Sequence, residues 1–482
     1  MELNQFPTEI LNHILSYLLK PRDIPEHPLN LNLVQRICDA RLVCRRWNEI
    51  ARAHLYQTLQ LGGIEDLYLR QWNPQLSVEA ARNAARHVII CTPPDYLLDE
   101  IDDASWVESI QGGDDPFISA IYRITELPNL TALTLDFYPN HWYATDNEGD
   151  LQRFLVLKDI RKIIFNAVLE SMVIRATNPD NTTIRSLLIS NMCEFPIPEI
   201  TSSDLFKSAT RNVESLHLMI KSTSAGLKRW FNLCTNEMRQ FEPYLQLDLL
   251  PSLAHQLKTL TLSFSKHWGI CSGSFDGRGL LLPRLETLTL GNYVIGGYKQ
   301  FDWVLAHKTL RTLILDRCCI VSHLRTDDDN AERWGLRTED WKKWPPFAFA
   351  FPTPPIETFT FAGTWEPVFD NIRYHLENLV DFYFNWDTRD PYFRRVGARR
   401  TELSPLRYIR FDFTECPGPW VDADEDGHFG FAEHTAKYRS DPPLSEEERL
   451  TLNPAETHKE RDGRALDDLL RAVEDRAWRN RR

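Results

Sequence analysis

The sequence predicts an α/β protein in which a short N-terminal helical module precedes a repeat solenoid with a curved parallel β-sheet. Two observations predict this fold class. Apolar residues recur at helical spacing within the first 55 residues, and the six-residue pattern apolar-x-x-apolar-x-apolar returns many times after them. The chain has 482 residues, of which 43% are hydrophobic, so it is long enough for two or three domains or for one extended repeat array.

The charge balance limits the class of binding partner, and the cysteines indicate the cellular compartment. Asp and Glu number 68 against 55 Lys and Arg, a net charge of −13, so we expect no nucleic-acid partner. The nine cysteines form no C-x-x-C pair, which is typical of reduced thiols in the cytoplasm or nucleus. Glu2 and Glu9 argue against a signal peptide, and no apolar run is long enough to predict a membrane span.

The first predicted helix lies in "FPTEILNHILSYLLKP", where Thr8 is a suitable N-cap and Pro21 ends the helix. Another helix is expected in "RLVCRRWNEIA", residues 41–51, with Asp39 as its N-cap. Both helices carry a wide apolar stripe, and three short helices within 55 residues are too few to bury two such stripes. The stripes therefore either pack on the rest of the chain or bind another protein.

Together the two segments closely resemble the F-box, whose pattern opens with Leu-Pro, continues with E-I-L/I-x-x-I-L-x-x-L and ends with R-L-V-C-R-x-W. Phe6 replaces the usual Leu, and the segment 20–37 is longer than is typical. The resemblance implies docking to the adaptor protein of SCF-type ubiquitin ligases, and through it to the cullin. The matching apolar positions, and hence the expected partner-binding residues, are Pro7, Ile10, Ile14, Leu15, Leu18, Val43, Cys44 and Trp47.

The repeated pattern after residue 55 predicts strands that point their first, fourth and sixth residues into a shared core. Four intervals between successive starts are 28, 25, 23 and 27 residues, which fits leucine-rich repeats. The chain resembles the irregular leucine-rich repeats found behind F-boxes in fungal proteins, although Asn or Cys is missing at position nine except at Cys318. The segments are "YQTLQL" (56–61), "ARHVII" (85–90), "LTALTL" (130–135), "IRSLLI" (184–189), "VESLHL" (213–218), "LKTLTL" (257–262), "LETLTL" (285–290), "LRTLIL" (310–315), "IETFTF" (356–361), "LVDFYF" (379–384) and "LRYIRF" (406–411).

Threonine is unusually frequent at the outward third and fifth positions of these strands. Strand propensity alone explains threonine there. The functional alternative is a hydroxyl-lined concave sheet that receives a protein substrate. Between two strands, Thr338 is expected to begin a short helix with Trp341 and Trp344, which either pack on the solenoid or serve as interface anchors. The candidate threonines are Thr259, Thr261, Thr287, Thr289, Thr312, Thr358 and Thr360.

The segment "DADEDGHFGFAE", residues 422–433, has the spacing of an EF-hand calcium loop. The preceding "ECPGPW" is no entering helix, so a solvated acidic loop is the preferred interpretation and no metal or cofactor is expected. The calcium ligands in the alternative interpretation are Asp422, Asp424, Asp426, His428 and Glu433, with Gly427 at the turn.

The predicted organisation is an F-box at 1–55, a leucine-rich-repeat-like solenoid at 56–420, and an acidic loop with a charged helical tail at 421–482. No phosphate loop, G-x-S-x-G elbow or H-E-x-x-H helix is present, so we expect no catalysis by this chain. The favoured function is the substrate receptor of an SCF-type ubiquitin ligase, which binds the adaptor and an unknown protein substrate. The alternative is an interaction scaffold whose N-terminal helices only cap the solenoid.

Overall fold

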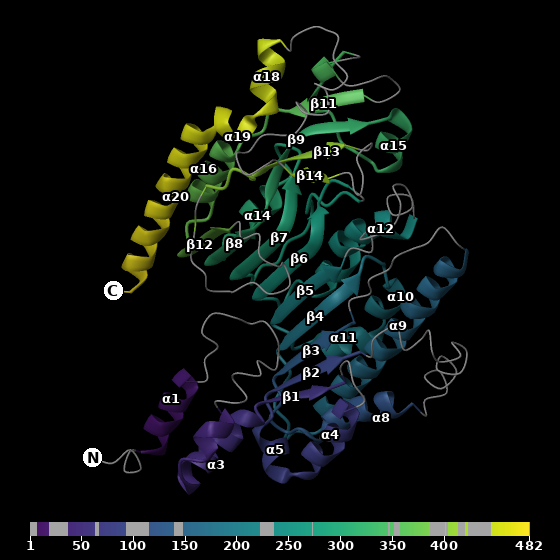
Figure 1. The fold of residues 1–482 in the computed structure, drawn as a ribbon, viewed down its shortest axis with the longest axis vertical. Helices are drawn as coiled ribbons and strands as arrows, with labels where there is room; N and C mark the ends of the chain where they lie inside the picture. The colour runs from purple at the N-terminus through teal and green to yellow at the C-terminus, as the bar shows by residue number, and fades with distance from the viewer. Residues whose placement is uncertain are drawn as a thin grey trace.

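The fold is mixed α/β and is built around one mostly parallel sheet (Figure 1). The computed structural model describes residues 7–18, 37–62, 67–92, 115–138, 148–221, 236–271, 273–345, 348–350, 357–385, 401, 403–412, 420–422 and 445–481.

Nine of the predicted segments form strands that pair in parallel with their neighbours, in chain order. The expectation of a parallel sheet is therefore confirmed. These strands are β1 (Thr58–Leu61), β2 (His87–Cys91), β3 (Ala132–Asp136), β4 (Ser186–Cys193), β5 (Ser215–Lys221), β6 (Thr259–Trp268), β7 (Thr287–Ile295), β8 (Thr312–Asp316) and β12 (Asp381–Asn385).

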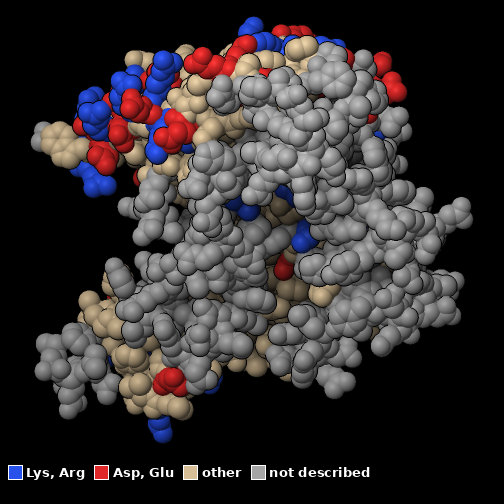
Figure 2. Space-filling view, turned by 45° about the horizontal axis from the view of Figure 1, so that its top comes forward, with Lys and Arg blue, Asp and Glu red and all other residues tan. Residues whose placement is uncertain are grey.

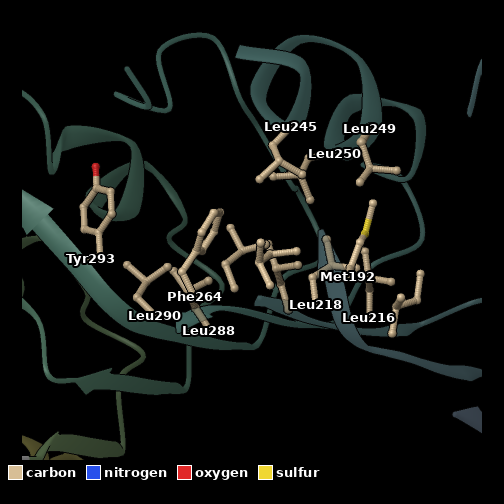
Figure 3. Packing of buried hydrophobic residues seen from close by; sticks show 14 of the residues in the cluster. Met192, Leu216, Leu218, Leu245, Leu249, Leu250, Phe264, Leu288, Leu290 and Tyr293 are labelled. Atoms are coloured by element: carbon tan, nitrogen blue, oxygen red, sulfur yellow. The ribbon is translucent and has the colours of Figure 1, made fainter. Parts of the chain in front are cut away.

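The alternation of buried and half-buried residues explains why these segments pair. In the β6 segment, Leu257, Leu260 and Leu262 are fully buried, whereas Thr259 and Thr261 remain half-buried on the opposite face. Neighbouring strands repeat this arrangement, so their leucines form one continuous core. Figure 3 shows strand leucines such as Leu218 facing Leu249 from a helical segment. Because each fully buried leucine contributes about 1.5–3 kcal/mol, the stacked rows supply most of the driving force.

The helices connect the strands, and α8, α9, α10 and α11 lie on one side of the first strands (Figure 1). They are α1 (Thr8–Leu18), α3 (Arg45–Leu55), α4 (Leu67–Ser77), α5 (Glu79–Ala84), α8 (Pro116–Tyr122), η2 (Arg123–Glu126), α9 (Glu148–Ala176), α10 (Pro198–Thr201), α11 (Asp204–Thr210), α12 (Asn236–Tyr244), η3 (Leu245–Leu249), α13 (Leu250–Ser252), α14 (Asp302–Ala306), α15 (Asp328–Arg333), η4 (Ala348–Ala350), α16 (Trp365–His375), α18 (Glu446–Leu452), α19 (Pro454–Thr457) and α20 (Lys459–Asn480). Among the described helices, none is long and apolar enough to cross a membrane.

The sheet divides at β7. The first half of β7 pairs with β8, and its last residues, Val294 and Ile295, pair with β9 (Cys319–Thr326). The second branch adds β10 (Trp341–Lys343), β11 (Glu357–Phe361), β13 (Tyr408–Asp412) and β14 (Trp420–Asp422). The prediction that "IETFTF" continues the parallel array was wrong, whereas "LRYIRF" is parallel to its neighbour as expected but lies on the second branch. The former is β11 and pairs antiparallel with β9, and the latter is β13 and pairs with β9 rather than β12.

The charged C-terminal segment forms α20, which packs against α16 and β12. Leu466, Leu469 and Val473 are buried, so the apolar stripe of this helix covers the end of the array. The outer face of α20 carries Lys and Arg interspersed with Asp and Glu (Figure 2). Asp462 is fully buried at the start of this helix and accepts hydrogen bonds from Arg407 Nε (2.8 Å), the Tyr408 hydroxyl (2.9 Å) and the Glu366 backbone N–H (3.0 Å).

Candidate functional site

The N-terminal module has a hydrophobic cluster of its own. Residues 37–41 add a short helical segment to α1 and α3, and the three segments bury their apolar side chains against one another. No member of this cluster belongs to the large core of the sheet. The buried members are Leu11, Leu15, Ile37, Trp47, Ile50 and Ala51.

Polar contacts hold α1 against α3. Arg46 Nη2 donates to the Thr8 hydroxyl (2.8 Å), and the His54 ring Nε2 lies 2.6 Å from Asn12 Oδ1. Burial lowers the pKa of His54, so the neutral ring is favoured at neutral pH. The module also contacts the rest of the chain, because α3 packs on α5. It is therefore a small unit that is joined to the sheet without being covered by it.

The eight predicted partner-binding residues differ in exposure. Leu15 and Trp47 are buried in the module, and Ile14 and Cys44 are half-buried. Pro7, Ile10 and Val43 are exposed, with 45% of Ile10 and 58% of Val43 accessible to solvent. The side chain of Leu18 lies outside the described residues. Trp47 therefore supports the module from inside, and the apolar surface offered outward comes from the exposed residues.

The prediction of one helix over residues 41–51 that begins after Asp39 was wrong, because Asp39 lies inside the helical segment 37–41, which ends before α3. The backbone turns at Leu42 and Val43, whose N–H groups donate to Asp39 O and Ala40 O, and Cys44 is extended before α3 begins. This turn moves Val43 off the stripe of Trp47 and exposes 85% of Leu42. Leu42 is a surface residue that the sequence interpretation missed. In one unbroken helix, Leu42 would not lie on the same face as Val43 and Trp47, so it was not counted among the partner-binding residues.

A family model described as F-box-like matches residues 3–61. The matched residues include the whole N-terminal module and β1. The F-box-like region has the helical segments and the exposed apolar residues described above. A comparison with curated proteins finds no match for this chain.

A second candidate surface is the polar face of the parallel sheet. Thr259 and Thr261 on β6 pair in register with Thr287 and Thr289 on β7, and Thr312 on β8 continues the first row. All five are half-buried on the face opposite the leucine core, as the sequence predicts. Their hydroxyl groups can donate and accept hydrogen bonds.

The register extends this face over all nine parallel strands, and two histidines that the sequence interpretation missed lie on it. His217 Nδ1 is 2.9 Å from the Thr261 hydroxyl, and His87 Nε2 is 2.8 Å from the Thr134 hydroxyl. Burial lowers the pKa of His87 to about 4, and it lowers that of His217 as well, so both rings are neutral at neutral pH. The first row has one charged residue, at its end, and runs through Thr58, His87, Ala132, Ser186, Ser215, Thr259, Thr287, Thr312 and Asp381.

The remaining predicted substrate residues do not join this face. Thr358 and Thr360 lie on antiparallel β11 and are only 7% exposed, so their predicted outward placement was wrong. Trp341 and Trp344 were expected on a helix, but Trp341 begins β10 and Trp344 follows it. Both indoles are buried and donate hydrogen bonds, Trp341 to Gly296 O and Trp344 to the Thr360 hydroxyl. The two tryptophans therefore pack inside the protein, which is one of the two alternatives that the sequence left open.

The EF-hand-like segment falls almost entirely outside the described residues. Only Asp422, the last residue of β14, is described, so the calcium interpretation stays untested. Within the described ranges, no group of three or more His, Cys, Asp or Glu side chains is arranged to hold a metal ion.

Proposed function

We propose that this chain is the substrate receptor of an SCF-type ubiquitin ligase. The F-box-like match at residues 3–61 supports a role in substrate recognition by such ligases, because F-box domains typically bind the adaptor that leads to the cullin. The observation that carries the proposal is the exposure of Ile10, Leu42 and Val43 on a module that already has its own buried core. Large apolar side chains that stay exposed on a small folded unit are candidate contacts for a partner protein.

The proposal assigns different roles to the two sets of matching residues. The adaptor covers Pro7, Ile10 and Val43, whereas Leu15 and Trp47 keep the module folded. Because 45% of Ile10 and 58% of Val43 are accessible, covering them contributes about 1 kcal/mol each. An aspartate at either position would have to lose its hydration in the complex, which costs several kcal/mol.

The test is co-purification of the adaptor with the double variant Ile10→Asp, Val43→Asp. We expect loss of the complex with an unchanged circular dichroism spectrum, because neither side chain supports the buried cluster. Leu281→Asp is a matched control, since Leu281 is equally exposed but lies just before β7. A double variant that retains the adaptor as well as the control does would refute this docking surface.

The alternative is an interaction scaffold whose N-terminal helices only cap the array, and the packing of α3 on α5 favours it. A scaffold would be stable without the adaptor and would show no change in hydrogen exchange at Ile10 and Val43 when the adaptor is added. The receptor should show protection at these positions. Hydrogen exchange of the full chain, with and without adaptor, therefore distinguishes the two.

We further propose that residues 56–420 form an irregular leucine-rich-repeat solenoid whose polar face binds the protein substrate. The supporting observation is the ladder of hydroxyl groups from Thr259, Thr287 and Thr312, in register on neighbouring strands. The receptor supplies no catalytic group. It raises the effective concentration of the substrate near the ubiquitin-conjugating enzyme, which is sufficient to accelerate transfer.

The substrate proposal is tested by comparing the proteins retained by the full chain and by the double variant Thr261→Arg, Thr289→Arg. Thr183→Arg is the control, because Thr183 is exposed and lies outside the sheet face. We expect quantitative mass spectrometry to find a set of proteins lost only with the double variant, while the adaptor is retained. Identical sets in all three samples would exclude this face.

A further inference from the structure

The helix α18 lies on the surface of the protein and buries none of its described side chains. Ser445, its N-cap residue, is exposed as well. The long helix α20, by contrast, buries Leu466, Leu469 and Val473 in the core. A segment without a buried apolar side chain opens locally at a small cost in free energy. We therefore expect α18 to leave the surface while α20 stays in place.

The surface under the end of α18 is a small aromatic cluster, which consists of Trp344, Ala348 and Phe349. The rings of Trp344 and Phe349 pack edge to face, with their centroids 4.8 Å apart. All three residues are buried, and none of them belongs to the large core of the sheet. Leu452, the last residue of α18, packs against this aromatic cluster. Buried aromatic side chains of this kind are typical anchors of an interface.

Opposite charges face each other where α18 meets β10. The Lys342 ammonium group lies 3.9 Å from the centroid of the Trp344 ring and pairs with the Glu447 carboxylate. The side chains of Lys342 and Glu447 are 51% and 63% exposed, so their ion pair contributes little to holding α18 in place. A cation at the edge of a binding surface does, however, select an acidic ligand over a basic one.

Glu448 joins α18 to a turn with an unusual backbone conformation. Its Oε1 accepts the Phe349 N–H (2.6 Å), and Phe349 has a φ of 58°, which residues other than glycine rarely adopt. Its Oε2 accepts both the N–H and the hydroxyl of Ser445 (2.7 Å each), as in a capping box. One carboxylate therefore begins the helix and also binds the turn that carries the aromatic cluster.

The contacts of α18 define a short sequence pattern. Glu447 and Glu448 supply the acidic contacts, and Leu452 supplies the apolar one. Glu448 and Leu452 are four residues apart, so they lie on the same face of a helix. A helix of another protein with leucine four residues after a glutamate can make the same contacts.

We propose that α18 occupies, within its own chain, a docking site for an acidic amphipathic helix of another protein. The site consists of Lys342, the Phe349 N–H and the aromatic cluster, and it is blocked while α18 is in place. A tethered segment has an effective concentration on the order of millimolar, so a free helix binds well only after α18 is released. This inference rests on the C-terminal half of the chain and does not depend on the ligase role.

The test uses the full chain and a fluorescent peptide with the sequence of residues 444–453, LSEEERLTLN. The double variant Glu448→Ala, Leu452→Asp removes two contacts of α18, and because neither side chain is buried the rest of the fold should persist. In fluorescence anisotropy, the peptide should bind this variant about tenfold or more tighter than it binds the wild-type protein. Leu450→Asp is the matched control, because Leu450 is 54% exposed on the same helix, and it should bind the peptide as weakly as the wild type does.

Two further measurements show what the peptide recognises and whether α18 has left. Lys342→Glu, added to the double variant, should reduce peptide binding, and a peptide that carries the same two substitutions at 448 and 452 should not bind. Hydrogen exchange in α18 should be faster in the double variant than in the wild type or in Leu450→Asp. Equal peptide affinity for the wild type and the double variant would overturn the proposal. So would an α18 that stays protected in the double variant, or peptide binding that Lys342→Glu leaves unchanged.

Discussion

Replacing Asp462 by alanine should release the C-terminal helix from the sheet. The Asp462 carboxylate joins α20 to β13 through Arg407 and Tyr408, and it also accepts the Glu366 N–H at the start of α16. Thr364, the N-cap residue of α16, makes no side-chain cap hydrogen bond of its own. Asp462 therefore caps a helix that is distant in the sequence, in addition to neutralising Arg407.

The expected cost follows from burial. Arg407 is 2% exposed and Asp462 is fully buried, so the alanine variant leaves a guanidinium inside the protein without its counter-charge. Breaking such a pair costs about 3–5 kcal/mol. Asp462→Asn also removes the counter-charge of Arg407, but it keeps one acceptor oxygen for the buried donors, so its cost should lie at the lower end of this range.

Hydrogen exchange is the appropriate assay, because it reports on α20 and α16 separately from the rest of the chain. Exchange of α20 and α16 should accelerate in Asp462→Ala, less so in Asp462→Asn, and not in the exposed control Asp475→Asn, whose stability should change by less than about 0.5 kcal/mol. If Asp462→Ala and the control exchange alike, the carboxylate does not hold the helix, and the reasoning fails.

Three further predictions concern other parts of the molecule. Asn292 has a φ of 58° and donates to Phe264 O, so Asn292→Ala should be less stable than Asn292→Gly by about 1 kcal/mol in urea unfolding, because glycine adopts this backbone without strain. Trp47→Ala should abolish hydrogen-exchange protection in α1 and α3 but not in β3–β8, since Trp47 belongs to the separate cluster; equal loss in both would show one shared core. Burial lowers the pKa of His87 to about 4, so the folded state binds fewer protons than the unfolded state, and the free energy of unfolding should fall as the pH drops from 6.5 toward 4, a slope that His87→Gln should reduce.

The sequence predicts the parallel strands well because period-two burial is a local property. Leu260, Leu262 and Phe264, which are buried at every second position, identify β6 without reference to any other segment. The pairing partner is not local, and for this reason the prediction fails at β11. Its sequence, "IETFTF", has the same apolar pattern as the parallel strands. In the structure, however, it pairs with the edge of β9 and not with the edge of β8. Which edge a strand joins depends on the whole fold, so Thr358 and Thr360 became buried.

Turns were the other source of error. The sequence interpretation looked for turn residues at position nine of each repeat and found Cys318, whose thiol does donate to Leu290 O (3.3 Å). The structure instead has positive φ one position earlier, at Asn191, Asn292 and Arg317. Asparagine favours this conformation, so the first two could have been predicted, whereas arginine carries no such signal. The exposed Leu42 was missed for the same reason, because nothing local marks the turn before Cys44.

The division of β7 limits how this protein can be shortened or recombined. Only Arg317 and Cys318 separate β8 from β9 in the sequence, and both of these strands pair with β7. A truncation after Asp316 would leave Val294 and Ile295 with bare backbone donors and acceptors, a template on which other chains aggregate. Engineers who wish to exchange repeats between related proteins should therefore cut before β7 and transplant both branches together.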